Sequence, residues 1–213
     1  MTPAALAEGK RSEGTDLTKV ADFLREHVAG KSLETKITEK IDNGKIEAVF
    51  TRRSSIINVL NSRNSLVFDE IAVIEQTNFD LDKDGRRQMP GHKKDRALVL
   101  RYEIRQSKST GALIGTSRVI SNSIDDSLGS ARSVRVKFED AKLTLHEVSV
   151  GYDDYFARGD SYKPGVGETR RVVSLVDGKV RMTDDSTSYD VDPETMIRSN
   201  KIQYGTLVGR EAN

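Results

Sequence analysis

Three carboxylates stand at alternate positions in the segment from Asp80 to Gly85. Carboxylates spaced in this way and closed by a glycine, which permits a sharp turn, can converge on a hard cation such as Ca²⁺. A complete calcium loop would supply a bidentate glutamate at its twelfth position, which is Gly91 in this chain. We therefore predict a calcium site at Asp80, Asp82 and Asp84, with an acidic, solvated loop tip as the alternative.

A second candidate site is the connection between residues 151 and 167, which holds three of the six tyrosines. Aromatic rings with polar tips offer a ligand or a partner a large contact area. The candidate ligand-binding residues are Tyr152, Tyr155, Phe156 and Tyr162. The alternative is that these rings fold back and plug the end of the core.

Most catalytic chemistries lack their residues in this sequence. The chain has no cysteine, which excludes disulfides, thiolate nucleophiles and cysteine-ligated metals. It contains no serine elbow and no phosphate-binding loop, and its three histidines lack metal-ligand spacing. Neighbouring carboxylates such as Asp153 and Asp154 would point to opposite sides of an extended chain. We assign no catalytic residue and expect a protein that is not an enzyme.

The charge balance and the hydropathy of the chain indicate which classes of partner to expect. The 34 basic and 33 acidic residues give a formal net charge of +1, which removes the electrostatic argument for nucleic acid. No apolar run reaches transmembrane length, so we expect no membrane span. Residues 1–14 lack the apolar core of a signal peptide. The protein is then cytoplasmic, or exported with a leader already removed.

The elements that must position these residues begin with one helix. Thr15 or Asp16 can cap it, and Gly30 suits the left-handed conformation that ends many helices. One apolar stripe at helical spacing comprises Leu17, Val20, Ala21, Leu24 and Val28. After Gly30 the apolar period becomes two, and Asn43-Gly44 predicts a tight hairpin.

Roughly nine strands joined mostly by short turns are predicted, which favours an antiparallel meander. The extended segments cover residues 33–41, 46–50, 55–60, 66–76, 97–106, 112–121, 134–138, 143–150, 169–176 and 179–183. Asp192-Pro193 predicts a short helix to about Arg198, followed by a final extended piece over 201–208. The two long connections, 78–96 and 151–167, are where functional residues are expected.

The order of these elements resembles that of the calycins, the lipocalin-like barrels. The resemblance covers roughly residues 16–208 and is one of architecture. It implies a mainly β chain: a flexible leader over 1–14 and one antiparallel up-and-down barrel over 15–213, with an N-terminal and a short C-terminal helix. A β-sandwich is the competing fold, because alternation does not reveal whether a sheet closes.

If the chain folds into the predicted barrel, the barrel interior holds a ligand or is filled by side chains. The leading functional hypothesis is a non-enzymatic protein that binds a small, largely apolar molecule, with its opening near the loop from Tyr152 to Tyr162. The alternatives are a protein-interaction or structural module and a carboxylate-dependent hydrolase or isomerase.

Overall fold

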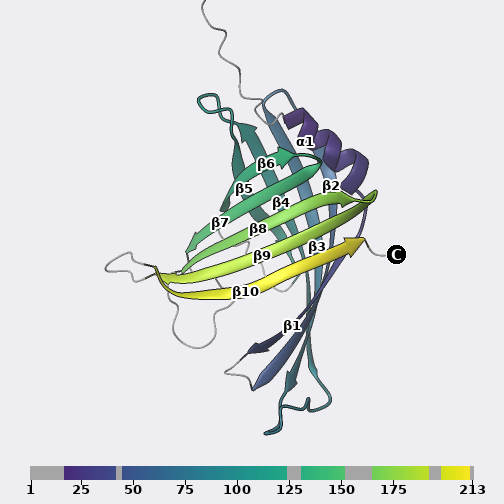
Figure 1. Ribbon diagram of the computed structural model, residues 1–213, viewed down its shortest axis with the longest axis vertical. Coiled ribbons are helices and arrows are strands. Elements are labelled where there is room, and N and C mark those ends of the chain that lie inside the picture. Colours follow the sequence, from purple (N-terminus) through teal and green to yellow (C-terminus); the bar gives the residue numbers. More distant parts are fainter. Residues whose placement is uncertain (1–16, 42–44, 124–130, 152–164, 192–197, 212–213) are drawn as a thin grey trace, which may run out of the picture.

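A computed structural model describes residues 17–41, 45–123, 131–151, 165–191 and 198–211. In these ranges ten strands form one closed antiparallel barrel, shown in Figure 1, so the fold is the predicted barrel and not a sandwich. The elements are α1 (Leu17–Phe23), a π-helical turn η1 (Leu24–Val28), β1 (Leu33–Ile41), β2 (Ile46–Asn61), β3 (Ser65–Asp80), β4 (His92–Gln106), β5 (Leu113–Asn122), β6 (Arg132–Glu139), β7 (Lys142–Gly151), β8 (Gly165–Val176), β9 (Lys179–Val191) and β10 (Arg198–Glu211).

The strands follow one another around the barrel in chain order, as an up-and-down meander. The ring closes where Leu33 and Glu34 of β1 pair with Glu211 and Arg210 of β10. Residues 46–50 and 55–60, predicted as separate strands, belong to the single strand β2. The predicted extended piece over 201–208 lies within β10.

The N-terminal helical segment lies over one end of the barrel. Every residue of its predicted apolar stripe is buried in the same core as the strands. The ring of Phe23 packs 5.1 Å from that of Phe138 on β6, while the helical segment also contacts β2 and β3 on the other side of the ring. Gly30 has the predicted left-handed conformation, with φ of 78°. The predicted caps Thr15 and Asp16 lie outside the described residues.

No helix in the described ranges combines the length and the apolarity that crossing a bilayer requires.

The two ends of the barrel differ. At the helix end, the strands are joined by the short connections 62–64, 107–112, 140–141 and 177–178. At the other end, called the open end below, the connections are 42–45, 81–91, 123–131, 152–164 and 192–197. Strands β1 to β4 extend past the other strands there, as the lower part of Figure 1 shows. This extension, residues 35–41, 46–52, 74–80 and 92–97, is called the lip.

Both long connections are shorter than the sequence predicted. The connection over 78–96 is reduced to 81–91, because β3 continues to Asp80 and β4 begins at His92. The strands around the second connection reach Gly151 and Gly165. The predicted C-terminal helix lies outside the described residues except for Arg198, which is instead the first residue of β10.

Two hairpin turns at the helix end have left-handed backbone at both central residues. The predicted turn Asp177-Gly178 has φ angles of 52° and 73°, and Asp140-Ala141 has 51° and 53°. Such turns match the twist of the strands they join, and glycine adopts them at no steric cost. Ala141 carries a Cβ atom and is therefore strained in this conformation.

Replacing Ala141 by glycine is expected to raise the free energy of unfolding by about 0.5–1 kcal/mol, because the steric strain exceeds the added chain entropy. Urea denaturation monitored by circular dichroism measures this free energy of unfolding. Ala112 lies in another turn without a positive φ. Ala112→Gly should therefore lower stability by about 0.5 kcal/mol. A loss of stability in both variants would contradict the strain at Ala141.

Candidate site in the barrel interior

The half of the interior next to the helix is a packed apolar core. Alternate side chains of the strands point inward, as the alternation of buried and exposed residues shows. Six inward side chains with at most 2% exposure are Leu66, Ile104, Leu113, Leu143, Val173 and Val180. Together with the helix stripe they form one continuous cluster that seals this end.

A layer of charged and hydroxyl side chains crosses the barrel below this core. It draws one or two inward-facing residues from each of the strands β2 to β9. The residues of this polar layer are Arg52, Ser54, Glu70, Tyr102, Ser117, Arg132, Glu147, Arg171 and Asp184. Three arginines face three carboxylates, so the formal charges of the layer sum to zero. A buried charge is tolerated only when it is paired in this way.

Arg171 is the centre of the polar layer. Its Nε and Nη2 donate to the two carboxylate oxygens of Asp184 at 2.7 and 3.0 Å. Its Nη1 donates to Glu70 and, at 3.4 Å, to the hydroxyl of Tyr102. Burial alone would lower the pKa of Arg171, but Asp184 and Glu70 outweigh it and hold that pKa well above the ordinary value. The guanidinium therefore ties β8 to β9, β3 and β4 as a permanent cation.

Glu70 lies between two arginines. Arg52 Nη2 donates to its Oε1 at 2.7 Å, and Arg171 donates to its other oxygen. Burial would raise the pKa of the Glu70 carboxyl, but Arg171 and Arg52 together lower it to about 2. Glu70 is thus ionised at neutral pH although its side chain is only 2% exposed.

The second half of the layer is built around Glu147. Its carboxylate accepts hydrogen bonds from the hydroxyls of Tyr102 and Ser117, both at 2.9 Å. Arg132 forms a looser ion pair with it at 3.6 Å. The ring of Tyr102 stacks on Phe68 with centroids 4.6 Å apart, which fixes the phenol in place. Burial, and then the charge of Glu147, raise the pKa of Tyr102 well above its ordinary value, so the phenol stays a proton donor.

The acidic and basic side chains of the layer differ in their exposure to solvent. The side chains of Glu70, Asp184 and Glu147 are 2–4% exposed, whereas those of Arg52 and Arg132 are 22% and 31% exposed. The carboxylates are thus enclosed by the layer, and the two arginines carry its accessible surface.

The half of the interior on the open side of the layer is lined differently. Its inward side chains on β2, β3 and β5 include the partly buried apolar Phe50, Ile74 and Val119, and the register also places Gln76 and Asn78 of β3 inward. On β7 and β8 the inward positions carry the partly buried hydroxyls of Ser149 and Thr169. We call this region the open half; apolar and polar side chains both line it.

The phase of three acidic residues in the sequence is a signal for the polar layer. Glu70, Glu147 and Asp184 each stand in phase with apolar inward residues of their own strands. A charged residue at such a position is an inward-facing charge that needs a partner on another strand. The sequence does not show which strand supplies that partner, because Arg52 and Glu70 meet only through the pairing of β2 with β3.

The predicted calcium residues lie at the tip of the lip, far from the polar layer. The carboxylate of Asp82 accepts hydrogen bonds from the backbone N–H groups of Asp84 and Arg86 at 2.9 and 2.8 Å, so it stabilises its own turn. Asp80 ends β3 and lies 4.0 Å from Nε2 of His92. In the described ranges no three histidine or acidic side chains are grouped so that they could hold a metal ion. The calcium site stays a prediction.

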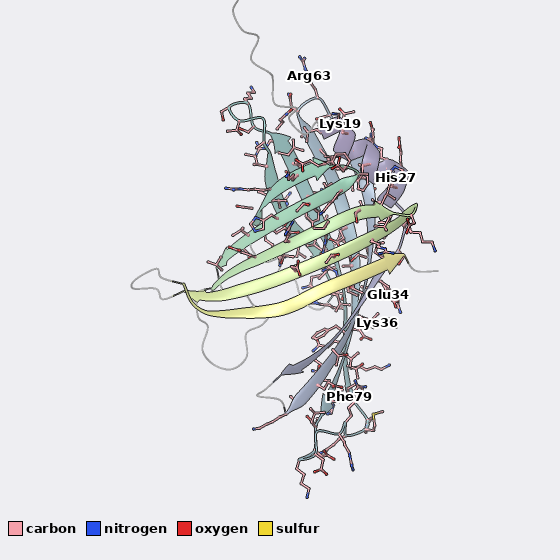
Figure 2. The ribbon with its side chains drawn as sticks, viewed as in Figure 1. Lys19, His27, Glu34, Lys36, Arg63 and Phe79 are labelled. Atoms are coloured by element: carbon pink, nitrogen blue, oxygen red, sulfur yellow. The ribbon has the colours of Figure 1, made fainter. Side chains whose placement is uncertain are left out.

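The tip is fastened to the outer face of the lip. The guanidinium of Arg87 lies 4.7 Å from the ring centre of Phe79 and also pairs with Glu47. Figure 2 shows Phe79 near the tip, with Lys19 and His27 at the opposite end of the molecule. These contacts hold the tip against the outer face of the lip.

The aromatic candidates Tyr152, Tyr155, Phe156 and Tyr162 lie outside the described residues. The glycines at the ends of the flanking strands, Gly151 and Gly165, pair with each other at the open end. The connection that carries these aromatic residues therefore starts and finishes beside the open half.

Comparisons with protein-family models, with curated proteins and with solved structures find no match for this chain.

Removing the central cation should destabilise the barrel. Arg171→Met leaves Asp184 and Glu70 buried without their main partner, and we expect a loss of about 3–5 kcal/mol in the free energy of unfolding. The neighbouring Arg170 is exposed on the outer face, so Arg170→Met should change stability by less than about 0.5 kcal/mol. Urea unfolding of both variants measures the difference, and equal losses would contradict a central role for Arg171.

Stability should also fall in acid because of Glu70. Its pKa is about 2 in the folded protein against an ordinary 4.5, so its stabilising contribution is complete above pH 4.5 and is lost as the pH falls toward 2. The shift corresponds to about 3 kcal/mol. Asp69, whose pKa is lowered by Arg101, titrates in the same direction. Glu70→Gln should therefore flatten, but not abolish, the fall in unfolding free energy between pH 5 and about 2.5; an unchanged slope would contradict the role of Glu70.

Proposed function

We propose that the protein is a non-enzymatic binding protein that takes a small, largely apolar molecule into the open half of the barrel. The observation that carries this proposal is the contrast between the two halves of the interior. Most apolar inward side chains next to the helix are fully buried, whereas Phe50, Ile74 and Val119 are only partly buried on the open side of the polar layer, where Ile74 and Val119 also pack against the core. Covering such surface is the usual driving force for binding an apolar ligand.

Two further features support the proposal. The polar layer has paired charges and forms a wall across the barrel, so a ligand would enter from the open end and stop at the layer. Calycins share the up-and-down barrel, and barrels of this size either hold one small ligand or are filled by side chains. The likeness is architectural and supports the proposal only by analogy.

The proposal assigns the entrance to the connection that carries Tyr152, Tyr155, Phe156 and Tyr162. Its flanking strands finish at the open end, which is the end without the helix. Rings with polar tips at such an entrance could contact both the ligand and water.

A neutral fluorescent probe, N-phenyl-1-naphthylamine, tests the proposal directly. Titration of the wild-type protein should give saturable, one-to-one binding with a blue shift, as the probe leaves water. Val119→Trp adds bulk at an inward position of the open half and should weaken binding at least about tenfold.

The matched control is Val73→Trp, since Val73 lies on the outer face of β3 and is 38% exposed. It should bind the probe like the wild type. Absence of saturable binding, or an equal loss in both tryptophan variants, would overturn the proposal.

A further inference from the structure

A row of basic side chains crosses the outer wall of the barrel from β4 to β8, strands that lie side by side in Figure 1. We call it the basic row; its members are Arg105, Arg135, His146 and Arg170. Each member is in register with the next, with Ile114 of β5 standing between the first two. Their neighbours in sequence, such as Val134 and Leu145, are buried in the core, so the side chains of the row point outward.

The three arginines of the basic row are exposed, and the imidazole of His146 is partly buried. Within the described residues, no side chain of the row forms an ion pair or a side-chain hydrogen bond. Other bases on this wall do have acids beside them: Lys137 contacts Glu139 at 2.8 Å, and Arg118 contacts Glu103 at 3.3 Å. The row therefore carries the unneutralised positive charge of this wall.

The wall formed by β1 to β4 is built differently. There Arg53 donates to Glu34 and to Glu75, both at 2.8 Å, and Arg101 donates to Asp69 at 2.8 and 3.0 Å. Cross-strand ion pairs of this kind stabilise a sheet, whereas like charges that stand opposite each other destabilise it. An acid in place of His146 would give the basic row the same pairing. Positions that break such a local rule are where functional residues are expected.

Two acids border the basic row at its β8 end. Glu168 stands two residues before Arg170, and Asp185 of β9 is in register with it. Each of these acids is already engaged in another contact. The middle of the row, around Arg135, is farther from both. The formal net charge of +1 averages over this wall and the paired wall of β1 to β4, and so it conceals the row.

We propose that the basic row binds the phosphate backbone of a nucleic-acid duplex. This site lies on the outer wall, so it is independent of the proposed binding of an apolar molecule inside the barrel. A guanidinium offers a planar fork of donors that matches the oxygens of a phosphate. Ser133 and Thr144 stand two residues from Arg135 and His146 on the same face, and short hydroxyl side chains also donate to phosphate oxygens.

The length of the row and the residues around it favour a duplex over a single strand. Neighbouring strands lie about 4.8 Å apart, so the row from Arg105 to Arg170 crosses four spacings, or about 19 Å along the sheet. A duplex presents one phosphate charge per about 1.7 Å of its axis and can therefore meet every cation of the row. Single strands are held mainly by stacking their bases on aromatic rings. The described outward positions of β5 to β8 carry no phenylalanine, tyrosine or tryptophan.

The test measures fluorescence anisotropy of labelled duplexes of roughly 20 base pairs, one of DNA and one of RNA with the same sequence, at several salt concentrations. The wild-type protein should bind with a dissociation constant in the micromolar range at low salt. The logarithm of the binding constant should fall with the logarithm of the salt concentration with a slope of about −3, as expected for three arginines on phosphates. Binding should depend little on base sequence, because phosphate contacts do not read it.

Arg135→Gln should weaken binding several-fold at low salt and make the salt slope shallower by about one. Adding Arg170→Gln should remove about one further unit of slope. The matched control is Arg53→Gln, because Arg53 is an outward arginine on the paired wall; its affinity and slope should equal those of the wild type. Arg135 and Arg170 are exposed, so both variants should fold, and circular dichroism checks this.

Three results would overturn the proposal: no salt-dependent binding of either duplex, an unchanged salt slope in the double variant, or an equal loss of affinity in Arg53→Gln. Tighter binding of a single-stranded DNA of the same length would also contradict it. So would binding to phosphatidylglycerol vesicles in place of the duplexes, which would identify a membrane surface as the partner. Salt-dependent binding that the two substitutions weaken supports the proposal, and a preference between DNA and RNA then identifies the source of the backbone.

Discussion

The pairing of Arg171 with Asp184 and Glu70 is the interaction on which the rest of the barrel depends. It joins the hairpin of β8 and β9 to β3, where Glu70 lies 101 residues before Arg171, around one permanently charged group. A cation so deeply buried is stable only while its acids remain ionised, and the low pKa of Glu70 keeps one of them so. Through Tyr102 the same contacts reach Glu147 and the far wall. An apolar layer could give equal stability, but it would not fix which strands face each other across the barrel.

This layer divides the interior into two regions that differ in side-chain burial and in the length of the connections between strands. On the helix side, most inward apolar side chains are buried and the turns between strands are short, as in Asp177-Gly178. On the open side, inward residues such as Ile74 keep contact with solvent, and the connections are mostly longer. Most of the fully buried apolar contacts thus lie near the helix, away from the half of the interior to which the proposed ligand is assigned. This separation is the physical basis of the proposed function.

Local patterns predicted the fold well, because they depend on neighbours in the chain. The apolar stripe of the helix, the period of two in β1 and the turn at Asp177-Gly178 all follow from near-neighbour sterics. Prediction from local patterns failed where a charged residue points into the barrel. Arg52 and Arg53 interrupt the alternation, and β2 was therefore predicted as two strands. Arg52 continues the strand because Glu70, eighteen residues away, accepts its hydrogen bond. The polar layer has the same origin, since each of its ion pairs joins residues at least 13 positions apart.

The surface of the layer also explains why its charge balance is a poor guide to what it could bind. Summed over all residues, the layer is neutral, as is nearly the whole chain at a formal charge of +1. Binding, however, responds to the groups that a ligand can reach, and within the described part of the layer the most exposed charged groups are Arg52 and Arg132. The carboxylates are held behind them by hydrogen bonds from Tyr102, Ser117 and Arg171. Among the described residues of the layer, the acids are thus enclosed and the two arginines carry the exposed surface, although the formal charges sum to zero.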